Sequence, residues 1–342
     1  MAFETGTFTS LSDLVTKIET FCTTSCGYTL TSGVLHSGDV HVTIAVSGAN
    51  LEVEAGTGSS AGVLTNPSES KYLRGTVLSV GIATYYPITY FFMYSATPDQ
   101  FTCVITYGDG WCQHMSFGEA LKYGTWGGGT FLSTTAQGTT TMAGSSASTY
   151  QQTYPDHTTR EYDNTTSNAL GHGSCSGAFF VSAFLNTLSV NYPPIAGTRG
   201  NSSLYCDLVT DSVTGSNWLG PFATNHVVDT RDGTLSVSSV SSYLIDNGIN
   251  SWSNEAILVA ADIYVKEAGE SQLIGTFPHT RYMRIDNFEV GQIITQGSDK
   301  WICFPHRKRG PHSWVHHTYR ARTYDTDGYS AGFGWAVRYD GP

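Results

Sequence analysis

Charged side chains are scarce in this chain of 342 residues. Asp, Glu, Lys and Arg together make up 13% of it, against about 25% in an ordinary globular protein. A freely diffusing enzyme usually stays soluble through mixed surface charges. The scarcity of charge, together with abundant Ser, Thr, Gly and aromatic residues, instead favours a β-rich protein whose surface lies against neighbouring subunits.

Concentrated positive charge is also lacking. The formal net charge is -11, and the mildly basic end of the chain, residues 281–342, holds nine Lys and Arg against six Asp and Glu. A nucleic-acid-binding domain usually carries a concentrated basic face, and the only dense basic run in the chain is 307–309. We therefore expect no sequence-specific binding to nucleic acid.

Long apolar runs are absent as well. The stretches Tyr85–Tyr94 and Ala256–Ala261 fall well short of the roughly 20 residues that cross a bilayer. Residues 1–6 lack the positive charge that begins a signal peptide, and no apolar run of about 7 to 15 residues follows them. We expect no membrane span and a protein that is made in a cytoplasm and stays soluble.

Seven cysteines are many for a cytoplasmic product, because disulfides are normally reduced there. Two interpretations stay open. The thiols are buried and pack as small hydrophobic side chains, or some oxidise after the protein leaves the cell, including one between chains because the count is odd. The candidates for disulfides are Cys22, Cys26, Cys103, Cys112, Cys175, Cys206 and Cys303.

Apolar spacing predicts one long helix near the N-terminus. Apolar residues recur three and four positions apart from Leu11 to Cys22, which is the helical period. Either Ser10 or Ser12 can cap the N-terminus of this helix, and Gly27 stops the run. We predict a single amphipathic helix.

From Tyr28 onward the sequence changes to short β-type runs separated by Gly, Asn and Asp. The first two predicted strands form a hairpin, and turns without intervening helices argue for a sandwich or barrel. The fold class is therefore predicted as mainly β, with β-sandwich or barrel-like sheets and one N-terminal amphipathic helix. The predicted strands are 41–46, 50–54, 77–82, 88–94, 101–107, 179–185 and 256–265.

A Ser- and Thr-rich stretch, 133–168, is the best internal boundary. Because it is poor in aliphatic residues, it fits a solvated linker or an arm that orders on a partner. It separates an N-terminal helix plus β domain, 1–132, from a second β region, 169–342, whose C-terminal segment is rich in aromatic residues and arginine.

No motif selects a catalytic or metal site. The spacing of Gly173, Cys175 and Gly177 resembles a nucleophile elbow, but the strand before it and the helix after it are missing, so a Gly-rich turn is favoured. Asp325 and Asp327 begin like a calcium loop that lacks its later ligands. The densest set of zinc-type ligands is interrupted by proline and glycine, which favours surface histidines: Cys303, His306, His312, His316 and His317. We expect no catalytic residue, metal or cofactor.

The C-terminal segment has the composition of a contact surface, because Tyr, Trp and Arg dominate the energetics of interfaces. The alternative interpretation is a sandwich core edged with arginines, which is favoured for Phe333 and Trp335. The basic run 307–309 fits an exposed loop that meets an acidic patch on a neighbour. The interface candidates are Trp301, Arg307, Lys308, Arg309, Trp314, Arg320 and Arg322.

Several segments resemble, in order along the chain, those of a group of tailed-bacteriophage virion proteins. They are the opening Met1–Thr7 with the helix after it, the paired strands Phe101–Thr106 and His114–Glu119, the small-residue stretch Trp126–Gly129 and the late strand Lys300–Pro305. The resemblance covers roughly residues 1–135 and 283–342, and it supplies no active-site residues.

The resemblance implies a non-enzymatic structural component of the neck, collar, tail or baseplate. Such a protein is made in the host cytoplasm and localised in the virion, and its partners are other virion proteins and copies of itself. The alternative is a receptor- or carbohydrate-binding module of a tail fibre, in which exposed Tyr and Trp stack on a glycan. A third hypothesis is a hydrolase whose carboxylates pair in space and not in sequence.

Overall fold

Antiparallel strands make up most of the described chain, and α1 is the single α-helix in it. Each of the three larger sheets is an open path of strands. The predicted fold class, mainly β with one N-terminal helix, is therefore confirmed, with open sheets in place of a barrel. The computed structural model describes residues 1–68, 71–73, 76–77, 80–108, 110–125, 128–134, 206–210, 217–219, 235–237, 258–267, 270–284, 288–305 and 333–341.

Strands that are distant in the sequence lie side by side in the larger sheets. The first sheet consists, in spatial order, of β1 (Ala2–Phe8), β11 (Ile88–Ala96), β12 (Asp99–Tyr107), β13 (Trp111–Glu119), β15 (Gly128–Thr134), β16 (Cys206–Thr210) and β17 (Asn217–Leu219). The second sheet consists of β2 (Thr29–Thr31), β3 (Val34–Ser37), β4 (Val40–Ser47), β5 (Asn50–Gly56) and β8 (Lys71–Leu73). The third sheet consists of β18 (Leu235–Val237), β19 (Val259–Glu267), β20 (Glu270–Arg284), β23 (Phe333–Arg338), β22 (Asp299–Pro305) and β21 (Gln292–Gln296), with β14 (Leu121–Lys122) paired to β20.

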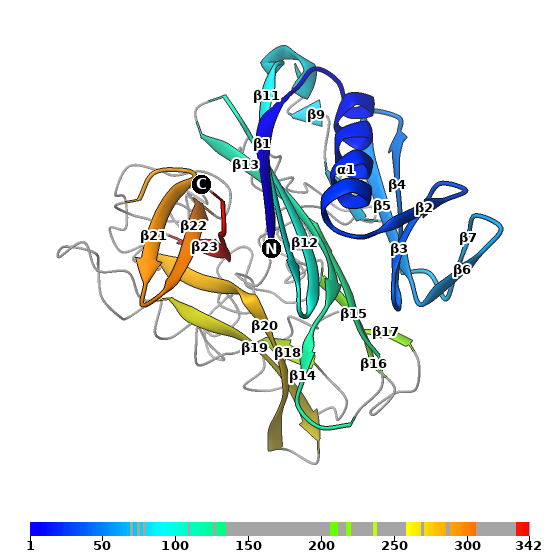
Figure 1. Ribbon diagram of the computed structural model, residues 1–342, viewed down its shortest axis with the longest axis vertical. Coiled ribbons are helices and arrows are strands. Elements are labelled where there is room, and N and C mark those ends of the chain that lie inside the picture. Colours follow the sequence, from blue (N-terminus) through cyan, green and yellow to red (C-terminus); the bar gives the residue numbers. More distant parts are fainter. Residues whose placement is uncertain are drawn as a thin grey trace, which may run out of the picture.

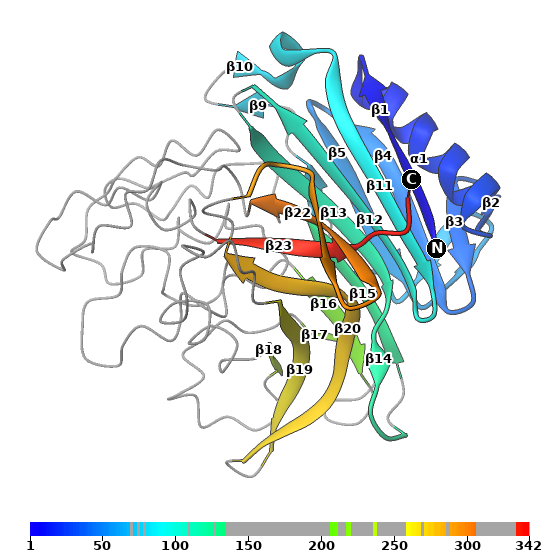
Figure 2. The same cartoon turned by 60° about the vertical axis from the view of Figure 1, so that its left-hand side comes forward.

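The first sheet is the middle layer of the molecule (Figures 1 and 2). The helix α1 (Leu11–Ser25) and the second sheet lie on one side of it, and the third sheet lies on the other. Side chains alternate between the two faces along each strand. On β11, Phe92 therefore packs with α1 and the second sheet, whereas its neighbour Met93 packs against the third sheet.

Among the described residues, a larger and a smaller hydrophobic core help to hold these layers together. Both are rich in aromatic rings, as in the contact of Phe21 with Phe92, whose ring centroids are 5.4 Å apart. The larger core includes Leu14, Ile18, Phe21, Val42, Val53, Phe92, Phe101 and Phe117. The smaller core joins the first and third sheets and includes Met93, Val104, Cys112, Ile302, Phe304, Trp335 and Val337.

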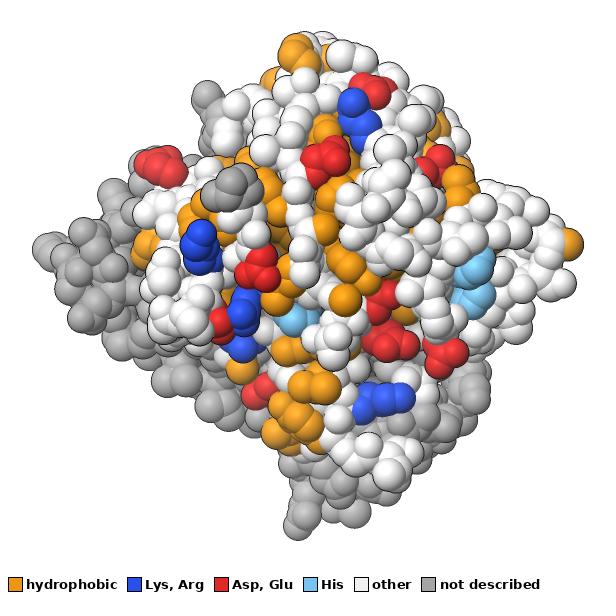
Figure 3. Space-filling view, in the orientation of Figure 1, with side chains coloured by type: hydrophobic (Ala, Val, Ile, Leu, Met, Phe, Trp, Pro, Cys, Tyr) orange, Lys and Arg blue, Asp and Glu red, His pale blue; other side chains and the backbone are white. Residues whose placement is uncertain are grey.

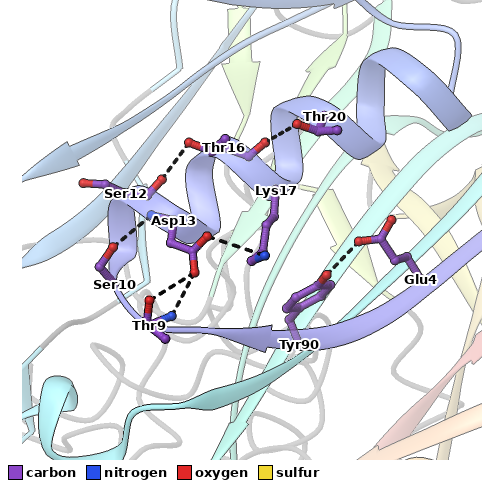
Figure 4. Close-up of polar contacts among 9 residues, drawn as sticks. All are labelled: Glu4, Thr9, Ser10, Ser12, Asp13, Thr16, Lys17, Thr20 and Tyr90. Carbon is purple, nitrogen blue, oxygen red and sulfur yellow. Dashed lines mark hydrogen bonds and ion pairs between the residues drawn. The ribbon is translucent and has the colours of Figure 1, made fainter.

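The helix α1 begins at Leu11, as its sequence predicts, and continues past the last periodic apolar residue, Cys22, to Ser25, before the predicted stop at Gly27. Ser10 is the N-cap, and its hydroxyl oxygen accepts a hydrogen bond from the Asp13 amide at 3.0 Å. The Asp13 carboxylate in turn accepts from the Thr9 amide at 2.9 Å and lies 3.5 Å from the Lys17 ammonium (Figure 4). The bond to Ser10 satisfies one of the backbone donors that the first turn of a helix leaves open, and the contacts of Asp13 fix the segment that enters the helix.

Most predicted strands on the described residues are confirmed with small shifts of their ends. The predicted hairpin forms from β4 and β5, and the segments Phe101–Thr106 and His114–Glu119 do pair, within β12 and β13. The single strand predicted at 77–82 is wrong: β9 (Thr76–Val77) and β10 (Val80–Gly81) pair with each other, and a 3₁₀ turn, η1 (Ile82–Tyr85), follows. A second small hairpin joins β6 (Gly58–Ser60) to β7 (Val63–Thr65). The predicted strand 179–185 lies outside the described residues.

Strand pairing crosses the predicted domain boundary. Residues 133 and 134 belong to β15, which pairs with β16, and β14 pairs with β20. The rest of the proposed linker, 135–168, lies outside the described residues. The division into regions 1–132 and 169–342 stays a prediction. Strands from both regions take part in the first and the third sheet.

Candidate contact surfaces and buried polar sites

Trp301, an expected interface residue, lies inside the protein with 2% of its surface exposed. It stands on β22 opposite Arg338 of β23. The guanidinium carbon of Arg281 lies 4.7 Å from the Trp301 ring centroid, and that of Arg338 lies 5.8 Å from it. Such cation–π contacts stabilise partly buried arginines. Trp301 therefore organises two cations within the chain and offers almost no surface to a partner.

A bulge in β20 explains the position of Arg281. The pairing of β20 with β19 skips from Arg281 to Phe277, which leaves Pro278, His279 and Thr280 out of that ladder. The Arg281 Nη1 donates to the backbone oxygens of Pro278 at 2.9 Å and of Thr280 at 2.8 Å. These bonds satisfy carbonyls at the disrupted part of the ladder. Burial lowers the pKa of the Arg281 guanidinium.

His279, within this bulge, links the third sheet to the first. Its Nε2 lies 3.0 Å from the backbone oxygen of Thr97 in the β11–β12 turn. Because a carbonyl only accepts, the proton belongs on Nε2. The Nδ1 atom is buried without a hydrogen-bond partner. Burial lowers the pKa of His279, and the nearby Arg338 and Arg281 lower it further, so the imidazole is neutral at physiological pH.

Carboxylates compensate the arginines of this cluster. The Arg338 Nη2 lies 2.6 Å from Asp299 Oδ1, and its Nε lies 3.9 Å from Asp340 Oδ1. The second ion pair is too long for a hydrogen bond. Because these charges already have partners within the chain, the cluster of Arg281, Trp301 and Arg338 stabilises the contact between β20, β22 and β23.

Asp99 is a half-buried carboxylate that joins the first two sheets. It begins β12, and its Oδ1 accepts a hydrogen bond from the Tyr28 hydroxyl at 2.8 Å. Burial raises the pKa of Asp99 to about 6, hydrogen bonds from Ser37 and Tyr28 oppose that rise, and the charge of Glu119 adds to it. At Gly118, with φ +144°, a Cβ atom would overlap the backbone oxygen of Asp99, so this close approach requires glycine.

The cysteines in the described part of the chain form no disulfide. Burial raises the pKa of four of these thiols, including that of Cys303 to about 12. A thiol without contact to solvent cannot reach a thiol of another subunit, so for these residues the structure supports the first of the two interpretations, buried free thiols. The buried free cysteines are Cys22, Cys26, Cys103, Cys112 and Cys303. Cys175 and the side chain of Cys206 lie outside the described part.

An exposed apolar patch, which no sequence pattern indicated, lies where β14 joins β20. Leu121, Tyr123 and Leu273 are 42%, 43% and 45% exposed. They are held together because Leu121 pairs with Thr276 and the Tyr123 amide donates to the backbone oxygen of Ile274 at 2.8 Å. Figure 3 shows apolar side chains gathered in this region, on a face where charged side chains are scattered. We call these three residues the β14 patch.

The remaining expected contact residues lie outside the part of the chain that the structure describes. Trp335 is buried, as the core interpretation predicted. Within the described ranges, no group of three or more His, Cys, Asp and Glu residues is arranged to hold a metal ion. Six interface candidates lie outside the described residues: Arg307, Lys308, Arg309, Trp314, Arg320 and Arg322.

No protein-family model matches the chain, and the search of curated proteins finds no match. None of the helices that the structure describes is both long enough and apolar enough to cross a membrane.

Proposed function

We propose that the chain is a non-enzymatic structural component of a tailed-phage virion, in the neck, collar, tail or baseplate, and that it acts through contacts between subunits. The β14 patch is the observation that carries the subunit contacts. Three large apolar side chains lie together there, each more than 40% exposed. Neighbouring exposed apolar side chains of this kind mark interaction sites.

The composition of the chain supports the same proposal. With 13% charged residues, the surface has few of the charges that keep a freely diffusing protein apart from its neighbours. The polar groups that we describe contact one another and the backbone, and two of their hydrogen bonds, from His279 to Thr97 and from Tyr28 to Asp99, connect different sheets. This arrangement suits a rigid subunit more than a site that must bind and release a substrate.

Light scattering of the purified protein over a range of concentrations tests the role of the β14 patch. We expect association of the wild-type protein, and we expect Leu121→Ser with Leu273→Ser to raise the midpoint concentration of association about tenfold or more, because less apolar area is buried. The matched control is Leu30→Ser with Val63→Ser, which removes two exposed apolar side chains, on β2 and β7, far from the patch in sequence. Equal effects of the two double variants would contradict the assignment.

Mass spectrometry of purified particles tests the virion assignment separately. We expect the chain at a fixed copy number per particle. Its absence would contradict the assignment to the virion, whereas glycan binding that is lost on Tyr123→Ala would favour the fibre-type module. Among the described side chains, Tyr123 is the only exposed large aromatic one, so a stacking surface built from several rings is not found there.

A further inference from the structure

Among the described residues, the strand β21 is the last strand at one edge of the third sheet. It pairs with β22 alone, in an uninterrupted antiparallel register from Gln292 to Gln296 (Figure 1). Its side chains are exposed except for a partly buried Ile294, and Ile293 is 42% exposed. In a strand with one neighbour, about half of the backbone N–H and C=O groups point away from it. Those of β21 have no strand partner among the described residues.

This edge lacks three of the usual protections against pairing with another chain. Besides being kept short, sheet edges are commonly protected by lysine, proline or a bulge. The five residues of β21 contain no charge and no proline, and their register with β22 shows no bulge. Gly291 and Gly297, both with positive φ, end the strand at turns on either side. The edge is therefore short, neutral and regular.

The sequence of β21 is complementary to itself in the antiparallel direction. A twofold axis at Ile294 places Ile294 of one copy opposite Ile294 of the other, Ile293 opposite Thr295, and Gln292 opposite Gln296. Pairs of β-branched side chains stabilise antiparallel strands, and a twofold contact uses the same surface on both subunits. Because β21 carries no charged residue, its pairing with a second copy places no like charges opposite each other.

We infer that two copies of this chain pair through β21, antiparallel and centred on Ile294, so that the two third sheets become one continuous sheet. This inference rests on the proposed function, because it names one of the subunit contacts. The partner at this edge is a second copy of the chain. Backbone hydrogen bonds join the two β21 strands, and the side-chain pairs around Ile294 set their register.

A charge test of the register uses two exposed positions that face each other across the axis. Ile293→Lys with Thr295→Lys places like charges opposite each other twice, and we expect association at this contact to weaken about tenfold or more. Ile293→Lys with Thr295→Glu places opposite charges there, and we expect association close to that of the wild type. Circular dichroism and thermal unfolding verify that both variants fold. Equal association of the two variants would overturn the inference.

A cross-linking test measures the same register by distance. Residues opposite each other in antiparallel strands have Cα atoms about 4.5 to 5.5 Å apart, which suits a disulfide. We therefore expect Ile294→Cys to give a covalent dimer on a non-reducing gel. Ile293→Cys is the matched control: it is more exposed, but the two copies of residue 293 lie diagonally, so it should cross-link much less. More cross-linking at 293 than at 294 would overturn the register.

The outcomes separate this inference from the proposed function. If the β14 patch variant loses association while the like-charge variant of β21 keeps it, the β21 contact is overturned and the proposed function stands. If the wild-type protein stays monomeric at every concentration, the β21 contact is overturned as well. The content of purified particles then decides the proposed function alone.

Discussion

At the scale of single residues, Asp99 makes the stability of the protein depend on pH. Its pKa is about 6 in the folded state against 3.8 ordinarily, mainly because of burial. Between these values the folded state binds more protons than the unfolded state, so stability falls as pH rises from about 4 to about 6 and then levels off. We expect Asp99→Asn, which keeps an acceptor for the Tyr28 hydroxyl, to stabilise the protein by about 1 to 2 kcal/mol at pH 8 and hardly at all near pH 4.

Urea unfolding of both proteins at several pH values measures this effect, and Asp13 supplies the control. The Thr9 amide and Lys17 lower the pKa of Asp13, so its stabilising contribution is present at neutral pH and is lost as pH falls through its folded pKa. Asp13→Asn should therefore destabilise the protein at pH 8, opposite in sign to Asp99→Asn. A loss of stability of the same size at pH 4 and pH 8 in Asp99→Asn would contradict the assigned role.

At the scale of elements, the N-cap of α1 distinguishes two serines that the sequence left equivalent. The Ser10 hydroxyl oxygen accepts a hydrogen bond from the Asp13 amide. At Ser12, the Thr16 hydroxyl donates to the backbone oxygen at 3.1 Å, and this bond does not depend on the side chain of residue 12. We expect Ser10→Ala to cost about 1 kcal/mol and Ser12→Ala to have little effect, because alanine favours the helix interior. Thermal unfolding of the two variants measures the difference, and equal losses would refute the assigned cap.

Local patterns in the sequence reveal some of these elements and leave others hidden. The helix was predictable because its buried residues follow a local period, and β4 with β5 because their turn is short. The pairing of β1 with β11, in which Ala2 meets Tyr94, has no local signal. The layers were also hidden, since β12 is buried on both faces and does not alternate between apolar and polar residues.

The candidate sites were predictable in composition and not in position. Aromatic and arginine residues mark an interface and a buried cation–π cluster equally well, so Trp301 could not be placed from its type. One signal was available: Pro278 lies within a run of strand residues, and proline inside a strand is typical of a bulge. That signal would have drawn attention to His279 and Arg281.

At the scale of the whole molecule, burial predicts how the thiols react. Five of the seven cysteines are buried and free, and a thiol buried in apolar surroundings is inert. We expect at most two thiols to react with a disulfide reagent in the native protein at pH 8, and all seven after unfolding. More than two reactive thiols in the native protein would contradict the burial of the five.

The position of β23 in the third sheet has a consequence for biosynthesis. This strand, at residues 333–338, lies between β20 and β22, both of which precede it in the chain. During translation, β20 and β22 are therefore made before the strand that separates them in the sheet. Trp335, a buried core residue on β23, is made last of the three strands. The third sheet is therefore completed only when β23 has been made. In a chain released before residue 338, the edges of β20 and β22 that pair with β23 lack this partner and can pair with other nascent copies.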